Sequence, residues 1–311
     1  MCASWNENAI TFADINWVGQ QPVGVFINDK DSIYVANREY GRILVWHNGS
    51  STDSNMNISG NLTNPWSLFV TSEGDIYVDN GNSNDRVDRW AINATNSRLV
   101  MKVSSMCTGL FVDINDNLYC SSANEHRVVK IALKSGNTLP STVAGTGCPG
   151  PVPNMLDHPH GIFVDKNLNL YVADTQNNRI QFFAPGQTNA ITVAGFGAVV
   201  YYLLNRPTGV VLDADGYLFI VDSHNHRIIR SIPNGFKCVV GCSGNKGSSS
   251  SQMNTPQTMA FDTNGNIFVS DYNNHRIQKF TLTWNSCGMS ISIAIELIEY
   301  HCLTNCFIRL E

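Results

Sequence analysis

The chain has 311 residues, of which 43% are hydrophobic and only 14% are charged, so it can bury a sizeable core and lacks the composition of a disordered protein. Its net charge of -5 provides no positive field that would draw in nucleic acid or an anionic membrane. This charge balance makes nucleic acid an unfavoured partner.

Cysteines and glycosylation sequons point to an oxidising compartment. The chain has nine cysteines, and an odd count leaves at least one of them unpaired within a single chain. Four Asn-x-Ser/Thr sequons begin at Asn48, Asn57, Asn61 and Asn93. Together these features favour a secreted or extracellular glycoprotein with disulfide bonds. No signal peptide is visible at the N-terminus, which leaves a cytoplasmic location as the alternative, and no stretch predicts a transmembrane segment.

A short motif recurs six times along the chain. Residues 159–165 and 207–213 illustrate it: a proline, two small or polar residues, three apolar residues and an aspartate. Such self-similarity is the mark of a repeat architecture, here with a period of roughly 45 residues. The copies begin at Pro22, Pro65, Cys107, Pro159, Pro207 and Pro256.

Each copy opens a series of four apolar runs. The motif itself is the first run; 170–174 is an example of the second, 179–183 of the third and 191–195 of the weaker fourth. The runs are rich in Val, Ile, Tyr and Phe and are bounded by Gly, Asn and Asp, as strands are. Four strands in a unit of about 45 residues predict one blade of a β-propeller.

Six such units predict an all-β fold, a six-bladed β-propeller with four-stranded antiparallel blades, over residues 1–287. Residues 9–13 have the character of a fourth strand, whereas the sixth copy shows only three strands. We therefore expect the N-terminal strand to close the ring by completing the last blade. Residues 288–311 fit no repeat and form a C-terminal tail to which the sequence assigns no structure.

The pattern Pro-x-Gly-apolar-apolar-apolar-Asp, followed by apolar-Tyr-Val-Ala-Asp-x-x-Asn-x-Arg-Ile, resembles the NHL repeat. Residues 165–179 are close to a consensus copy, and the likeness extends over about residues 9–282. The second and third copies depart from the pattern at Ser67, Thr71 and Cys107. The resemblance implies a propeller but no single function, because NHL-like propellers occur in RNA-binding and ubiquitin-ligase proteins, in a peptide-amidating lyase and in extracellular scaffolds.

One face of the predicted disc should carry the loops between second and third strands together with the linkers between blades; we call it the loop face. Its polar, aromatic and histidine-bearing loops suit a protein, peptide or glycan ligand, although Asn, Asp and Gly also recur in such loops for structural reasons alone. We expect a non-enzymatic binding scaffold. The candidate binding residues are Arg38, Tyr40, His126, His160, Asn178, His224, His226, Tyr272 and His275.

Two other functions stay open. Three imidazoles converging on the propeller axis could bind zinc, and the amidating lyase of the wider family has a metal-binding histidine after a blade's first proline. Here only His160 matches that position, which makes it a weak metal candidate for a zinc-dependent peptidyl-hydroxyglycine amidating lyase-like or hydrolase-like enzyme. The second alternative, an RNA-binding or ubiquitin-ligase-associated propeller, is disfavoured by the acidic charge and by the lack of a RING-like Cys/His set before the propeller.

Two recurrent acidic features have structural explanations. Turns such as 262–265 begin like calcium loops but lack the closing acidic residue, so we predict no cofactor, with zinc or calcium as the alternative. An Asp and an Arg flank the loop between second and third strands, where a charge-assisted bond can hold the hairpin together, as Asp174 with Arg179, Asp222 with Arg227 and Asp271 with Arg276. A catalytic pair would not recur in successive blades, so we expect these pairs to be structural.

The cysteine positions predict two disulfides. Cys107 and Cys120 lie on the first two strands of one hairpin, where cross-strand proximity favours a bond. Cys2 and Cys287 each adjoin a Trp-Asn dipeptide near the proposed ring closure and are expected to pair there. Residues 238 and 242 lie in an apparent strand, about 13 Å apart by strand rise, so these two cysteines are not expected to pair if the strand stays extended.

Overall fold

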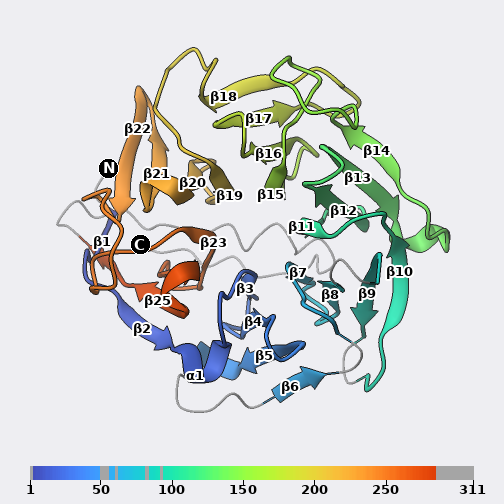
Figure 1. Ribbon diagram of the computed structural model, residues 1–311, viewed down its shortest axis with the longest axis horizontal. Coiled ribbons are helices and arrows are strands. Elements are labelled where there is room, and N and C mark those ends of the chain that lie inside the picture. The colour runs from blue at the N-terminus through green and yellow to red at the C-terminus, as the bar shows by residue number, and fades with distance from the viewer. Residues whose placement is uncertain (1–2, 50–55, 60–61, 81–83, 92–93, 285–311) are drawn as a thin grey trace, which may run out of the picture.

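The computed structural model describes residues 3–49, 56–59, 62–80, 84–91 and 94–284. Within these residues, six four-stranded antiparallel sheets stand as blades around a central axis (Figure 1). In five of the sheets the four strands follow chain order from the inside to the outside of the ring. The six-bladed propeller that the repeat predicts is confirmed.

The first four blades are formed by consecutive strands. Blade 1 consists of β3 (Val25–Ile27), β4 (Ile33–Asn37), β5 (Arg42–Trp46) and β6 (Met56–Ser59). Blade 2 consists of β7 (Leu68–Val70), β8 (Ile76–Asp79), β9 (Arg86–Trp90) and β10 (Arg98–Lys102). Blade 3 consists of β11 (Cys107–Val112), β12 (Asn117–Ser122), β13 (Arg127–Ala132) and β14 (Ser141–Ala144). Blade 4 consists of β15 (Pro159–Val164), β16 (Leu170–Asp174), β17 (Arg179–Phe183) and β18 (Ile191–Gly195).

The last two blades and the short helices complete the structure. Blade 5 consists of β19 (Pro207–Leu212), β20 (Leu218–Asp222), β21 (Arg227–Ile232) and β22 (Gly235–Val240). Blade 6 consists of β23 (Pro256–Phe261), β24 (Ile267–Asp271), β25 (Arg276–Phe280) and the N-terminal β2 (Ile10–Ala13). The helical elements are α1 (Ile15–Val18) and the single 3-10 turns η1 (His47–Gly49), η2 (Leu133–Ser135), η3 (Ser223–Asn225) and η4 (Tyr272–Asn274). Within the described part of the chain, no helix has the length and apolar character needed to cross a membrane.

The N-terminal segment closes the ring, as the sequence predicts. Strand β2 pairs antiparallel with β25 and supplies the outer strand of blade 6. The Phe12 ring packs edge-on against Trp46 of blade 1 and Phe268 of blade 6, at centroid distances of 5.4 and 5.3 Å. An additional two-stranded sheet, β1 (Ala3–Trp5) with β26 (Leu282–Trp284), joins the two ends of the described chain.

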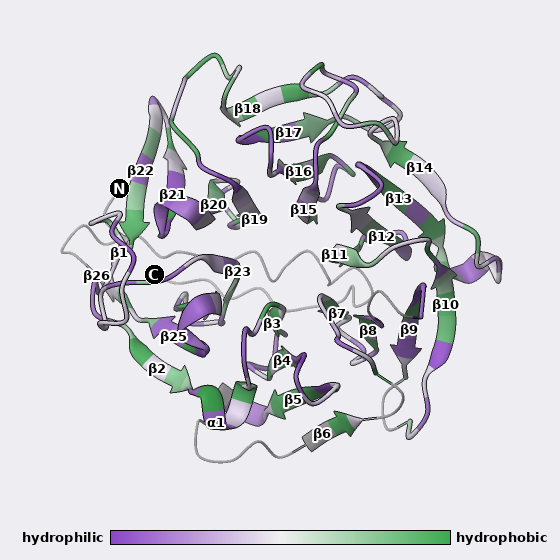
Figure 2. Ribbon diagram, in the orientation of Figure 1, coloured by the Kyte–Doolittle hydropathy of each residue, from purple (hydrophilic) through white to green (hydrophobic). Residues whose placement is uncertain are grey.

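Apolar side chains from neighbouring sheets pack between the blades, which explains why many strands are apolar on both faces. In one cluster, Phe69 and Tyr77 of blade 2 pack with Leu110 and Cys120 of blade 3. Figure 2 shows hydrophobic stretches on the strands of every blade. A blade that is covered on both faces needs few charged residues, in keeping with the low charged fraction of the sequence.

Around the axis, inner strands lie very close to one another. A Cβ atom added to Gly161 would lie 2.6 Å from the carbonyl oxygen of Thr208 on the next blade, so this crossing requires glycine. Threonine hydroxyl groups also form hydrogen bonds between neighbouring blades near the axis. Thr108 Oγ1 donates to the Pro159 carbonyl over 2.7 Å, and Thr258 Oγ1 donates to the Val23 carbonyl over 2.7 Å. The ring is therefore joined by polar bonds at its centre as well as by the apolar packing between blades.

In the Asp-rich turns between first and second strands, the aspartate side chain accepts hydrogen bonds from groups of the same turn. Asp262 Oδ1 accepts hydrogen bonds from the N–H groups of Asn264 (3.1 Å) and Asn266 (2.8 Å), and its Oδ2 accepts from Asn266 Nδ2 (2.7 Å). Such side-chain to backbone bonds are what Asp favours in turns. Turn formation thus accounts for these carboxylates without an ion.

Two disulfides lie within the described residues. Cys107 and Cys120 are joined across β11 and β12, as the hairpin predicts. The expectation that Cys238 and Cys242 do not pair was wrong: they are bonded, with Cα atoms 5.6 Å apart. Strand β22 ends at Val240, and Gly241 turns the chain with a φ of 71°, so the segment is not extended.

The structure does not describe several residues for which the sequence makes predictions. Cys2, Cys287 and the tail at 288–311 lie outside the described residues, as do Asn61 and Asn93. Among the sequon asparagines that are described, Asn48 is exposed in η1.

Candidate functional site

In blades 4, 5 and 6, an Asp–Arg pair holds the hairpin of the second and third strands against the linker that enters the blade. The buried Asp174 carboxylate accepts from Arg179 Nε (2.7 Å), Asn177 Nδ2 (2.9 Å) and the backbone N–H of Asp157 (2.6 Å). Arg179 in turn donates to three linker carbonyls, those of Pro151, Val152 and Met155. These bonds support the structural interpretation of the pairs. The arrangement recurs as Asp222–Arg227 (2.8 Å) and Asp271–Arg276 (2.8 Å).

Four of the candidate binding residues also make a repeated bond between blades. Each accepts a hydrogen bond from the backbone N–H of the residue that precedes the first proline of the next blade. Each has a positive φ of about 50°, which Asn and His adopt more readily than most residues. The bonds are His158 N–H to His126 Nδ1 (3.2 Å), Arg206 N–H to Asn178 Oδ1 (2.8 Å), Thr255 N–H to His226 Nδ1 (3.1 Å) and Gln21 N–H to His275 Nδ1 (3.0 Å). A structural function therefore explains why these side chains recur, and a binding function for them stays a prediction.

A second group of side chains gathers at the loop-face end of the channel. The Arg38 guanidinium lies over the Trp66 ring, with Cζ 4.3 Å from the ring centroid, and Arg38 Nε donates to Asn64 Oδ1 over 2.7 Å. The Trp66 ring also meets the His160 ring edge-on, at a centroid distance of 6.4 Å. We call Arg38, Asn64, Trp66 and His160 the mouth cluster. It combines residues that enter from blades 1, 2 and 4.

Sequence reasoning selected Arg38 and His160 but missed Trp66 and Asn64. The sequence did contain a signal for Trp66. It lies directly after the first residue of the repeat motif, and only the second of the six copies has a tryptophan at this position. The equivalent positions are Val23, Trp66, Thr108, His160, Thr208 and Gln257.

The remaining candidates also lie in loops of this face, and Tyr40 shares the loop of Arg38. Tyr40 is 60% exposed, with Arg42 over its ring. His224 is exposed in η3. The Tyr272 hydroxyl donates to Gln21 Oε1 over 3.1 Å. These residues could enlarge a binding surface around the mouth cluster.

The His160 imidazole is neutral at physiological pH. Burial, assisted by the nearby charge of His158, lowers the pKa of His160 from 6.5 to about 4. A neutral imidazole offers one hydrogen-bond donor and one acceptor, so it can bind polar ligand groups of either kind.

The lowered pKa of His160 predicts acid sensitivity. The folded protein binds fewer protons at this site than the unfolded chain between pH 4 and 6.5, so the stability contribution is complete above pH 6.5 and is lost as the pH falls toward 4. We expect wild-type protein to lose about 3 kcal/mol more than a His160→Gln variant between pH 7 and pH 4. Urea denaturation of both proteins across this range measures the difference. Parallel pH profiles for the two proteins would refute the assignment.

Beneath the mouth, the channel contains an apolar cavity of about 210 Å³. Its lining runs from the level of Gly24 to Asn28, Asp29 and Ile114 in the turns at the opposite end. Four phenylalanines from successive inner strands form a partial collar around it: Phe26, Phe69, Phe111 and Phe163, with neighbouring ring centroids 4.9 to 5.1 Å apart. This cavity was not among the sequence predictions, although an aromatic residue at the same position of four inner strands was the signal for it.

A comparison with protein-family models identifies the repeat in three of the blades. A family model for the NHL repeat matches residues 156–183, 204–230 and 253–280, which lie in blades 4, 5 and 6. The other three blades have the same strand order and close the same ring. The protein is a six-bladed β-propeller with NHL repeats in its last three blades.

Solved structures share the fold of this NHL-repeat propeller at low identity. A protein of unknown function from Bacteroides thetaiotaomicron has a TM-score of 0.73 and 13% identity, over 90% of this chain and 76% of that one. An auxiliary nutrient binding protein from the same organism has a TM-score of 0.66 and 17% identity, over 89% and 72%. A virginiamycin B lyase from Staphylococcus aureus has a TM-score of 0.61 and 13% identity, over 90% and 100%. A search of the curated proteins found no match to the sequence.

Proposed function

We propose that this NHL-repeat propeller is a non-enzymatic scaffold that binds a protein, peptide or glycan at its loop face, centred on the mouth cluster. The observation that carries the proposal is the convergence of Arg38, Trp66 and His160 from three different blades. Tryptophan and arginine dominate the binding energy of protein interfaces, because they combine large stacking surfaces with directed hydrogen bonds. The ring face of a tryptophan also suits a sugar ring or a peptide side chain.

The polar groups of the mouth cluster would orient such a ligand. The Arg38 fork can bind a carboxylate or a carbonyl, and the neutral His160 imidazole can donate or accept. The exposed amide of Asn64 lies beside them. This mixture of one cation, two rings and one amide fits a ligand with polar and apolar parts.

The chemistry of the chain also supports an extracellular setting. Two disulfides lie within the described residues, and Asn48 presents an exposed sequon asparagine. Disulfides persist in oxidising compartments and are rare in the cytosol. A structural neighbour named as an auxiliary nutrient binding protein is in keeping with ligand binding.

A metal-dependent lyase or hydrolase is the second candidate, because one structural neighbour is named as a virginiamycin B lyase and because His126, Asp157 and His158 could hold a metal ion. Catalytic zinc requires three protein ligands at a position that substrate can reach. Of the six positions that follow a blade's first residue, only the one in blade 4 has a histidine, His160, so these positions do not supply such a set on the axis. This geometry favours binding over catalysis. The acidic net charge gives no support to RNA as the ligand.

A ligand screen tests the proposed function. The intact chain is applied to peptide and glycan arrays together with Trp66→Ala, and with Lys134→Ala as a control whose side chain is exposed in η2, between β13 and β14, away from the loop face. We expect discrete hits that Trp66→Ala loses and Lys134→Ala keeps. Turnover of a peptidyl-hydroxyglycine or a lactone by the zinc-loaded chain would contradict the non-enzymatic assignment. Retention of every hit by Trp66→Ala would contradict the site.

A further inference from the structure

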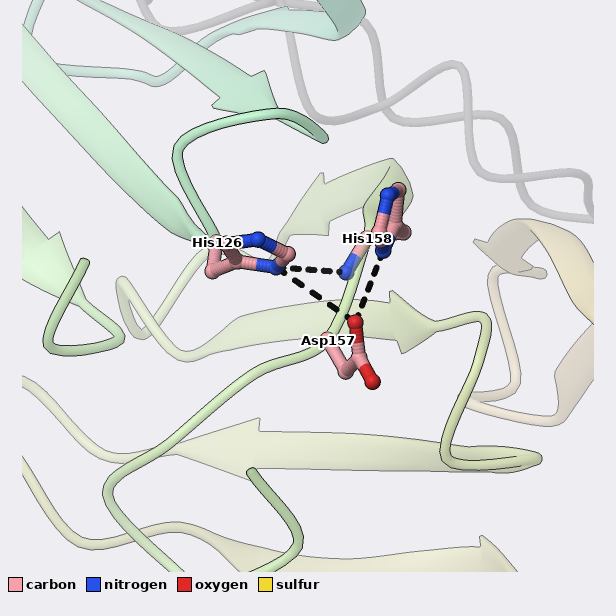
Figure 3. Close-up of side chains that lie close together, drawn as sticks. All are labelled: His126, Asp157 and His158. Carbon is pink, nitrogen blue, oxygen red and sulfur yellow. Dashed lines mark hydrogen bonds and ion pairs between the residues drawn. The ribbon is translucent and has the colours of Figure 1, made fainter. Parts of the chain in front are cut away.

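Two histidines and an aspartate meet where blade 3 contacts the linker that enters blade 4 (Figure 3). Asp157 Oδ1 lies 2.7 Å from His158 Nδ1 and 3.4 Å from His126 Nδ1. Each residue offers one ligand atom, and the three atoms lie within 4.8 Å of one another. The group shares no residue with the mouth cluster, although His158 lies only two residues before His160.

An equivalent junction elsewhere in the ring shows which of these residues the fold requires. Between blades 5 and 6, His226 Nδ1 accepts from the N–H of Thr255 over 3.1 Å, just as His126 accepts from the N–H of His158 over 3.2 Å. The residue before Thr255 is Asn254, whose backbone N–H donates to Asp271 Oδ1 over 2.7 Å. Blade 4 has the same bond from Asp157 N–H to Asp174 Oδ1.

The backbone bonds of the two junctions therefore match, although one has Asn-Thr where the other has Asp-His. The junction between blades 5 and 6 is made without a carboxylate and without a second imidazole at these positions. The side chains of Asp157 and His158 are thus additional to what the junction needs. Together with His126 they make a set of possible metal ligands that the junction between blades 5 and 6 lacks.

We propose that His126, Asp157 and His158 form a zinc-binding site at the junction of blades 3 and 4. Two imidazole nitrogens and one carboxylate oxygen are a frequent ligand set for zinc, with the fourth tetrahedral position open to water. In a tetrahedral site with bonds of about 2.0–2.1 Å, ligand atoms lie roughly 3.3 Å apart. The side chain of His158 is 42% exposed, so a small change of its rotamer can bring the three atoms to that spacing.

The protonation of the group suits a cation. His126 Nδ1 accepts the His158 N–H, so this nitrogen carries a lone pair, as a zinc ligand must. A bound ion would replace that hydrogen bond and the close contact between His158 and Asp157.

A zinc ion bound here would connect the loop of blade 3 to the linker of blade 4. Ligands that bind the folded state alone stabilise it by mass action. Zinc should therefore raise the melting temperature of the propeller, and the rise should depend on the ion concentration. This zinc site would use no residue of the mouth cluster.

The test titrates zinc chloride into chelator-stripped, dialysed full-length protein by calorimetry. The comparison is an Asp157→Asn/His158→Thr variant, which has the residue types of Asn254 and Thr255 at the junction between blades 5 and 6. It should fold, with an unchanged melting temperature in the absence of zinc. We expect wild-type protein to bind one more equivalent of zinc than the variant, and zinc to raise the melting temperature of the wild type alone. Equal zinc stoichiometry in the two folded proteins would overturn the proposal.

Cobalt(II) identifies the ligands of that equivalent. Cys148 is exposed in the same linker and could bind the ion in place of the proposed set. We expect the cobalt equivalent that the variant loses to show a tetrahedral d–d spectrum without a thiolate charge-transfer band. A thiolate band in that equivalent would overturn the assignment to His126, Asp157 and His158.

Discussion

Replacing Asp174 by alanine should destabilise the propeller by about 3–5 kcal/mol, because it leaves the Arg179 guanidinium buried without its carboxylate. Side-chain exposure is 6% for Arg179 and 0% for Asp174, so water cannot replace the lost partner. The change also removes the acceptor of the Asp157 N–H, by which the linker is held to blade 4. Urea denaturation monitored by circular dichroism measures the loss.

Blade 3 provides the matched control. At the position of Asp174 it has Ser122, and its Arg127 pairs with Glu125 over 2.8 Å in a more exposed setting. Exposed ion pairs contribute about 0–1 kcal/mol, so Glu125→Ala should cost less than about 1 kcal/mol. Equal effects of Asp174→Ala and Glu125→Ala would show that burial of the pair is not what matters.

Phe12→Ala should cost about 3–5 kcal/mol, the usual range for removing a buried phenylalanine. The ring lies between Trp46 and Phe268, so its loss leaves a cavity where the N-terminal strand closes blade 6 against blade 1. The cluster around Phe12 packs the last blade against the first, so damage here should affect the whole domain. Thermal and urea unfolding should both shift as single transitions.

Ile10 in the same strand is the control for Phe12. Its side chain is 62% exposed, and Ile10→Ala should change stability by less than about 0.5 kcal/mol. If Phe12→Ala proved as mild as Ile10→Ala, the N-terminal strand would contribute little to the closed ring.

The architecture could be predicted because the same strand pattern occurs in six copies along the sequence. Six copies of the motif locate the strands, and the missing fourth strand of the last copy leaves residues 9–13 as its natural complement. The Asp–Arg pairs could be predicted for the same reason, since Asp174 and Arg179 are close in sequence and face one loop. Local information was sufficient for both.

The candidate site could be predicted only in part, because it depends on contacts between blades. Trp66 and His160 are far apart in sequence and meet because the ring closes. In the same way, the sequence does not show that His126 Nδ1 accepts the backbone N–H of His158, 32 residues further on. The wrong prediction for Cys238 and Cys242 had a local cause: the extended strand was assumed to continue through Gly241, where the chain turns.

The central claim is that the loop-face mouth is a ligand site that does not transform its ligand. The most direct measurement is calorimetric titration of the strongest array ligand into wild type, Trp66→Ala and Lys134→Ala, with the ligand recovered and analysed afterwards. We predict that Trp66→Ala raises Kd by about 30-fold or more, the effect of losing a binding hot spot, while Lys134→Ala stays within about twofold and the ligand is recovered unchanged. An unchanged Kd for Trp66→Ala, or a chemically altered ligand, would contradict the account.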